Sequence, residues 1–136
     1  VLLYASDTWT IIETDARRIH PFHMQCQRRI LNIRWYDLVS NEVVAARTGL
    51  PSVLDIIKSR RLSLFGHVAR LPDGVPAHSA LLLAADVASG VKLPHGWRRP
   101  RGRPCKSWIQ QISADGLPTE DTRASALDRT KWRRDV

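Results

Sequence analysis

The chain has 136 residues, with 21 Lys or Arg against 13 Asp or Glu, so its formal net charge is +8. This length and a hydrophobic content of 43% allow one ordinary domain with a core, or a piece of a larger protein. The positive charge favours polyanionic partners, nucleic acid before a membrane surface. The longest apolar run, Ala80 to Ala85, is far too short to cross a bilayer.

The cysteines and the first residues indicate where the protein works. Cys26 and Cys105 lie far apart, without the spacing of a disulfide framework, which suits a reducing compartment. No signal peptide is visible at the start, so we expect a nuclear or cytoplasmic protein that is not secreted and has no membrane partner. Because the first residue is Val1 and not Met, we also expect a fragment or a processed product.

The chain opens on a short apolar run, Val1 to Tyr4, which periodicity does not assign to strand or helix. A helix is then predicted over residues 14–33, because apolar residues recur there at steps of three and four. Its Pro21 either kinks this helix or restarts it with His20 as the N-cap. The predicted apolar face consists of Ile19, Phe22, Cys26, Ile30 and Ile33.

His20, His23 and Cys26 are spaced by three residues and share a broad face of this helix. Imidazole and thiolate groups bind zinc, so these residues are weak candidates for a metal site, with Cys105 or another histidine as the fourth ligand. The alternative is a buried thiol beside two ordinary histidines. We therefore assign no metal and no cofactor to the chain.

Residues 34–39 are predicted to be a connector, and two helices follow it, over residues 42–48 and from 52 to about 70. Ser40 has the side chain of an N-cap, and Gly49 suits the turn between the helices. Two helices around a glycine turn are compatible with a DNA-reading helix-turn-helix.

A plain helical hairpin is nevertheless the favoured interpretation of these two helices. Asp55 and Lys58 fall where a helix-turn-helix usually needs apolar side chains. Lys58, Arg60 and Arg61 of the longer helix are instead predicted to contact phosphates.

After a turn at residues 71–74, helices are predicted over residues 77–88 and 106–114, and Thr119 or Ser125 caps a final helix. No alternating strand series and no internal repeat is visible. The sequence therefore predicts a mainly α protein, a small helical array with one extended basic loop rich in Pro, Gly and Arg.

This basic strip, residues 91–106, is the one sizeable cation cluster without a neutralising acid nearby, because no Asp or Glu occurs between Asp86 and Asp115. Like charges repel, so the cluster needs an external anion. Prolines keep the strip extended, and Gly102 lets its backbone approach a surface closely. The cations of the strip are Lys92, Arg98, Arg99, Arg101, Arg103 and Lys106.

The core of the strip, residues 100–104, resembles an AT-hook, the short minor-groove peptide built on Arg-Gly-Arg-Pro. An extended peptide with two arginines fits the narrow, electronegative minor groove of A·T-rich DNA. The alternative is a solvated basic loop that leads into a helix with Pro104 at its first position. Contact with DNA or RNA is the interpretation that we favour.

Two tryptophans, Trp97 and Trp108, flank the arginines of the strip. An indole ring can stack on an unpaired base. Trp108, however, has helical spacing with Ile112, which is more typical of a core residue.

Several motifs in one order resemble the C-terminal end of the reverse transcriptase polyprotein of non-LTR, LINE-type retrotransposons. They are LLYASDTW, FHMQCQRRILNIRWYD with SNEVVAARTGLPS, RRLSLFGHVARLPD, RGRPCKSW and DRTKWRR. The resemblance extends from Leu2 to Arg134. The residues on motif positions are Phe22, His23, Cys26, Arg29, Trp35, Gly66, His67, Arg70, Gly102, Arg103, Pro104, Trp108, Asp128, Arg129 and Trp132.

The resemblance implies a parent RNA-directed DNA polymerase with an N-terminal endonuclease, a reverse transcriptase domain and a thumb. The catalytic Asp-Asp motif of that polymerase lies upstream, and Asp7 is not part of it. This fragment would therefore be no enzyme by itself. It would grip template RNA, primer or target DNA, with the upstream reverse transcriptase domain as its protein partner.

The resemblance divides the chain into residues 1–13 (end of the thumb-like region), 14–90 (helical segment), 91–106 (AT-hook-like strip) and 107–136 (C-terminal helices).

The chain also departs from the family pattern. Ala5-Ser6-Asp7 replaces the usual Gly-Ser-Glu, and Pro21 stands where a helix former is usual. Cys105 and Ser107 replace cations that often follow the core of the strip. These changes are compatible with a decayed or domesticated element.

Two functions of other classes stay open. In one, the amphipathic helices form a protein-interaction module that docks on the upstream thumb, and the strip is incidental. In the other, a metal-dependent nuclease uses His20, His23 and scattered acids.

Overall fold

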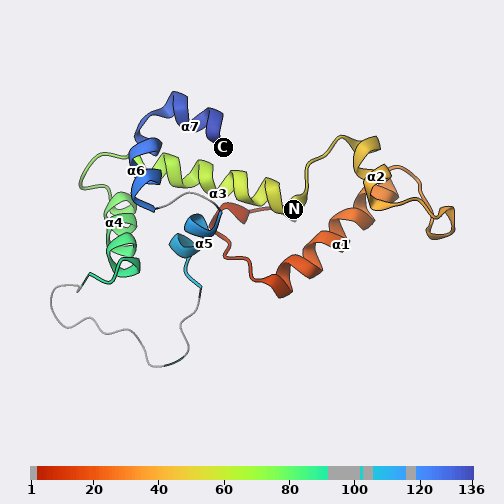
Figure 1. Ribbon diagram of the computed structural model, residues 1–136, viewed down its shortest axis with the longest axis horizontal. Helices are drawn as coiled ribbons and strands as arrows, with labels where there is room; N and C mark the ends of the chain where they lie inside the picture. Colours follow the sequence, from red (N-terminus) through yellow and green to blue (C-terminus); the bar gives the residue numbers. More distant parts are fainter. Residues whose placement is uncertain (1–2, 92–101, 103–105, 116–118) are drawn as a thin grey trace. The chain divides into compact units, whose positions relative to one another are not determined.

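The structure, a computed structural model, describes residues 3–91, 102, 106–115 and 119–136. In these residues it consists of seven α-helices and two short 3-10 turns, with no strand (Figure 1). The prediction of a mainly α protein is confirmed. The chain forms two compact units: unit 1 consists of Val1–Thr10 and Ser59–Val136, and unit 2 consists of Ile11–Lys58.

The first helix of unit 2, α1 (Glu13–Ile30), is a single helix that continues through Pro21. The predicted alternative of a restart at His20 is therefore wrong. The helix begins where the carboxylate of Asp15 accepts a hydrogen bond from the backbone N–H of Ile12 at 3.4 Å. This contact satisfies one of the donors that the first turn of a helix leaves free.

The buried side of α1 differs from the predicted apolar face. Met24 and Gln27 are the buried residues of this helix, whereas Phe22 is 48% exposed and Ile30 is 78% exposed. The spacing of apolar residues therefore predicted the helix correctly but gave it the wrong inner face. The reason is that a polar residue, Gln27, occupies the centre of the buried side.

Gln27 is buried because both ends of its amide have partners. Nε2 lies 3.1 Å from Nδ1 of His23, and Oε1 accepts a hydrogen bond from the hydroxyl of Thr48 at 2.8 Å. A buried amide is tolerated when its hydrogen bonds are made. Thr48 is the last residue of α2 (Asn41–Thr48), so this amide joins α1 to α2.

The next helix, α3 (Val53–Ala69), contributes to both units. Its first turns bury Val53 and Ile57 completely in unit 2. From Ser59 onward it carries the core of unit 1, which also receives side chains from four later helices. These are α4 (Pro76–Ala88), α5 (Trp108–Ala114), α6 (Thr119–Leu127) and α7 (Arg129–Asp135). The core residues are Leu62, Phe65, Ala69, Leu81, Ile109, Ile112, Ala126 and Trp132.

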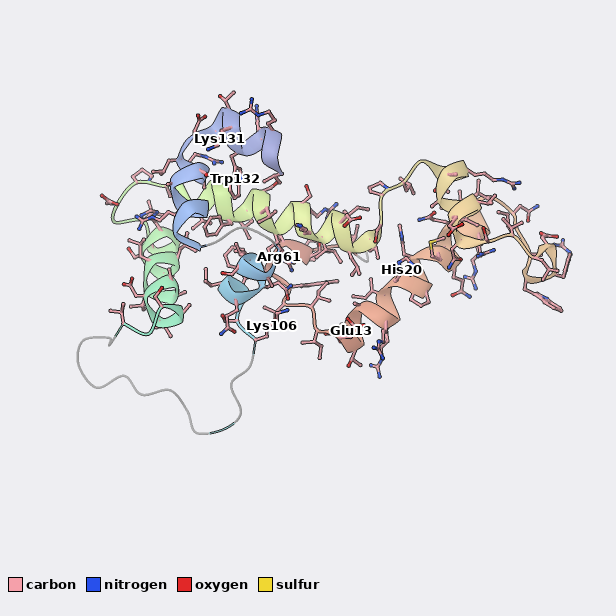
Figure 2. All side chains as sticks on the ribbon, in the orientation of Figure 1. Glu13, His20, Arg61, Lys106, Lys131 and Trp132 are labelled. Atoms are coloured by element: carbon pink, nitrogen blue, oxygen red, sulfur yellow. The ribbon has the colours of Figure 1, made fainter. Side chains whose placement is uncertain are left out.

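Trp132 of α7 packs against α3 at the point where α3 has no side chain (Figure 2). The indole is 3% exposed, and its N–H donates to the carbonyl oxygen of Leu62 at 3.1 Å. Its ring centroid lies 5.9 Å from that of Phe65. A Cβ at Gly66 would lie well inside van der Waals contact with the indole nitrogen, so this approach requires glycine.

Asp128 separates α6 from α7, where one final helix was predicted. Its carboxylate Oδ1 accepts hydrogen bonds from the backbone N–H groups of Lys131 at 3.1 Å and Thr130 at 2.9 Å. These two bonds hold the pKa of Asp128 below its usual value of 3.8. Asp128 is therefore the N-cap of α7, the helix that carries Trp132.

Gly66→Ala is expected to destabilise unit 1 by about 1–3 kcal/mol, because the added methyl group collides with the indole of Trp132. At an unconstrained helix position the same change stabilises by about 0.5–1 kcal/mol. The sign of the change in unfolding free energy therefore shows whether Gly66 is in close contact with Trp132. Urea unfolding followed by circular dichroism measures the change. In a Trp132→Leu background, Gly66→Ala should cost less stability. An equal loss of stability in both backgrounds would contradict the contact between Gly66 and Trp132.

Asp128 is expected to make stability depend on pH. Its folded pKa is lowered, so the ionised cap stabilises the protein above the unfolded pKa, and this contribution is lost as the pH falls through the folded pKa. Asp128→Asn keeps an N-cap acceptor that does not titrate. The advantage in Tm of the wild type over Asp128→Asn should therefore be largest near neutral pH and shrink below about pH 4. A difference that stays constant across this range would show that the cap does not titrate as described.

Candidate nucleic-acid interface

The structure describes two residues of the predicted strip site, Gly102 and Lys106. Gly102 is exposed and has a φ of 138°, in the region that favours glycine. Lys106 is exposed and directly precedes Ser107, the N-cap of α5 (Figure 2). The other cations of the strip, Lys92, Arg98, Arg99, Arg101 and Arg103, lie outside the described residues.

The C-terminal end of the strip is fixed by a capping box. The Ser107 hydroxyl accepts from the backbone N–H of Gln110 at 3.2 Å, and the Gln110 side chain accepts from the backbone N–H of Ser107 at 2.9 Å. This cap starts α5 at Trp108, two residues after the predicted start. Lys106 is therefore attached to a defined helix end.

Trp108 has a structural role. Its indole N–H donates to the carbonyl oxygen of Asp7 at 2.9 Å, and its ring centroid lies 6.3 Å from that of Phe65. The side chain is partly buried against the core of unit 1. These contacts favour the core interpretation of Trp108 over stacking on a base.

Two of the three predicted cations on α3 are available at the surface. Lys58 and Arg60 are both exposed. Arg60 donates from Nη1 to the carbonyl oxygen of Leu3 at 2.7 Å, which leaves other guanidinium N–H groups for an anion. Both residues stay candidates for phosphate contacts.

Arg61 does not fit the predicted phosphate contact. It is 3% exposed, and its Nη2 lies 2.7 Å from Oδ2 of Asp115. Its Nε donates to the same oxygen at 2.8 Å, and its Nη1 donates to the carbonyl oxygen of Trp9 at 2.9 Å. The guanidinium is thus neutralised and enclosed, so the prediction that Arg61 reaches an external phosphate is corrected: it links three segments of unit 1.

His20, His23 and Cys26 lie along α1 in unit 2. Burial, and secondarily the charge of His20, hold the pKa of His23 below 6.5. The ring of His23 also contacts the amide of Gln27. Within the described ranges, no three His, Cys, Asp or Glu side chains gather closely enough to hold a metal ion.

An open groove of about 780 Å³ lies in unit 1 between residues 3–8 and one side of α3. Ser59, Ser63 and His67 recur along it at every fourth position. These groups can donate hydrogen bonds, and the groove is lined by both an acidic residue, Asp7, and a basic residue, Arg60. Of the predicted site residues that the structure describes, Arg60 borders the groove.

The helix order expected for the hairpin is confirmed, since Gly49 ends α2 with a φ of 64° and α3 follows. Asp55 and Lys58 are exposed. The prediction of a plain helical hairpin, with a DNA-reading helix-turn-helix as its alternative, stays open as far as DNA reading is concerned.

Sequence reasoning missed one exposed group, in the segment that was treated as a connector. Trp35 is 88% exposed and Leu38 is 89% exposed, on the loop that joins α1 to α2. The signal that could have found it is the succession of Arg34, Trp35 and Tyr36, a cation beside two aromatic rings.

Comparison with known proteins gives one relative. The chain is similar to an uncharacterized transposon-derived protein of Caenorhabditis elegans, F52C9.6, with 27% identity over 143 residues. The similarity covers 96% of this chain but 48% of the relative, so the chain spans about half the length of that protein. No family model and no solved structure matches.

The structure adds one observation on membranes. In the part of the chain that it describes, no helix is long and apolar enough to cross a bilayer.

Asp115→Ala is expected to destabilise unit 1 by about 3–5 kcal/mol, because it leaves the buried guanidinium of Arg61 without a counter-charge. Glu13→Ala is the matched control. It breaks the Arg17–Glu13 ion pair, whose side chains are 77% and 74% exposed, and should change stability by less than about 1 kcal/mol. Chemical unfolding of both variants measures the difference. Similar losses in the two variants would contradict the burial of the Arg61 pair.

Proposed function

We propose that this chain is the nucleic-acid-binding C-terminal segment of a retrotransposon reverse transcriptase and is not catalytic by itself. The observation that carries the proposal is the basic strip, which holds six cations from Lys92 to Lys106 and no acid. Similarity to a transposon-derived protein over 96% of the chain supports the retroelement origin. In the parent RNA-directed DNA polymerase, the segment would grip template RNA, primer or target DNA. An element of this kind that a host has domesticated would keep the same binding chemistry.

The charge of the strip supports binding to a polyanion. Lys106 is exposed, and the nearest acids along the sequence are Asp86 and Asp115. Asp115 already pairs with Arg61, so its charge is not available to the strip. Each phosphate that the strip contacts releases counterions, which makes the affinity depend on salt.

The position of the strip in the chain also favours binding. It follows α4 and leads into the capped start of α5, so both of its ends connect to helices of unit 1. A segment tethered at both ends loses less conformational entropy on binding than a free tail. Exposed Lys58 and Arg60 on α3 would add to the phosphate contacts, whereas Arg61 would not.

Fluorescence anisotropy of labelled nucleic acid across a salt series tests the proposal with the whole chain. If all six strip cations contact duplex phosphates, log K should fall with log salt at a slope of about −5. Arg101→Ala/Arg103→Ala should make the slope shallower by about 2. The ligands are A·T-rich duplex, G·C-rich duplex, single-stranded RNA and an RNA–DNA hybrid. Preference for A·T-rich duplex would indicate minor-groove binding, and preference for the hybrid would indicate contact with template and primer.

Arg18→Ala/Arg47→Ala is the matched control, because it removes the same charge from two exposed positions outside the strip. It should change the salt slope much less than the strip variant. A slope near zero for the wild type, or equal effects of the two double variants, would overturn the proposal. Docking of the helices on the upstream thumb would then be the favoured function.

A further inference from the structure

The loop between α1 and α2 presents an aromatic side chain almost entirely to solvent. Trp35 is 88% exposed within the 3-10 turn η2 (Trp35–Asp37). Tryptophan is usually largely buried, because burial of its ring contributes strongly to stability. An indole held at the surface is therefore available for a ligand.

Hydrogen bonds hold the loop in its middle and at its C-terminal end. The carboxylate of Asp37 accepts from the backbone N–H of Arg34 at 2.7 Å. Nη2 of Arg28 donates to the carbonyl oxygen of Val39 at 2.7 Å and to the side chain of Asn41 at 2.8 Å. The backbone that carries Trp35 is therefore ordered before any ligand binds, which lowers the entropic cost of binding.

The neighbours of Trp35 combine aromatic rings with positive charge. The Tyr36 ring meets the Trp35 ring edge to face, with centroids 5.7 Å apart and an interplanar angle of 76°. The Arg34 guanidinium lies 5.8 Å from the Tyr36 ring centroid and donates to its hydroxyl at 2.6 Å. An edge-to-face contact covers at most one face of the indole, and with Trp35 88% exposed at least one broad face of its ring is open to a ligand. Arg29, near the end of α1, is also exposed.

We propose that Trp35 is a stacking platform for an unpaired base of single-stranded RNA or DNA, with Arg34 and Arg29 close to the strand's phosphates. This inference rests on the proposed function and adds a second contact to it, in unit 2 and separate from the basic strip of unit 1. Stacking on an indole tolerates any base, since every base has a π-face. The site therefore selects single strands over duplexes, in which the bases are already stacked.

The aromatic and cationic neighbours favour a nucleic acid over a protein as the ligand. Exposed Leu38 on the same loop would also suit an apolar protein surface. A protein contact of that kind would use Leu38 and Trp35 together, whereas base stacking uses Trp35 alone. Leu38 is consequently the matched control for the experiment.

The test uses the whole chain and three labelled ligands of about 15 nucleotides: oligo(U), oligo(dT) and a duplex of the same length. Trp35→Ala should weaken binding to the single strands by about 5-fold to 150-fold and leave duplex binding and the salt slope unchanged. Trp35→Phe should restore most of the affinity, because a phenyl ring also stacks. Leu38→Ala should bind as the wild type does, and circular dichroism checks that each variant is folded.

Single-strand affinity that is unchanged in Trp35→Ala would overturn the inference, as would an equal loss in Leu38→Ala or for the duplex. An equal loss in Leu38→Ala would point to an apolar contact with a protein. If Arg101→Ala/Arg103→Ala loses binding and Trp35→Ala does not, the proposed function stands and this inference fails. If the wild-type chain binds none of the oligonucleotides, both fail.

Discussion

The rest of unit 1 depends on the enclosed charge of Arg61. Its guanidinium lies on α3, and its partners are Asp115 at the end of α5 and the carbonyl oxygen of Trp9 near the start of the chain. A buried cation without these partners would cost several kcal/mol, so the three segments must meet at one point. The arrangement also sets the position of α5, and α5 carries the attachment of the basic strip at Lys106. Arg61 is buried and does not contact the proposed ligand, but it positions the helix to which the cations of the strip are attached.

The sequence was informative about which residues form helices and less informative about which sides of them are buried. Spacing, caps and glycine stops predicted the helices of the hairpin and the mainly α class, because these signals are local. The inner side of α1 was mispredicted, because it depends on Gln27 finding partners on both sides of its amide. One of those partners, Thr48, lies 21 residues away, and no local pattern contains that information.

In the candidate interface, too, local sequence patterns did not show which side chains are buried. Arg60 and Arg61 are neighbours of identical type, yet one is exposed and the other is buried, because successive side chains on a helix point about 100° apart. Composition can identify an excess of cations but not which of them are already paired. Trp35 was placed correctly in a connector, but the sequence pattern did not show that its side chain is exposed there. The charge pattern of the sequence therefore identified the strip. The three-dimensional contacts were needed to show which of the other candidate residues are exposed and which are buried.

The packing of Trp132 against Gly66 has a consequence for synthesis on the ribosome. The indole bonds to Leu62, 70 residues earlier, so the core of unit 1 stays open until residue 132 has emerged. At translation rates of about 5–20 residues per second, the interval is roughly 4 to 14 seconds. Unit 2 is continuous from Ile11 to Lys58, so all of its residues are synthesised before this interval begins. During this interval the apolar side of α3, with Leu62 and Phe65, lacks the side chain of Trp132 that later covers it, and exposed apolar surface of this kind is prone to aggregate.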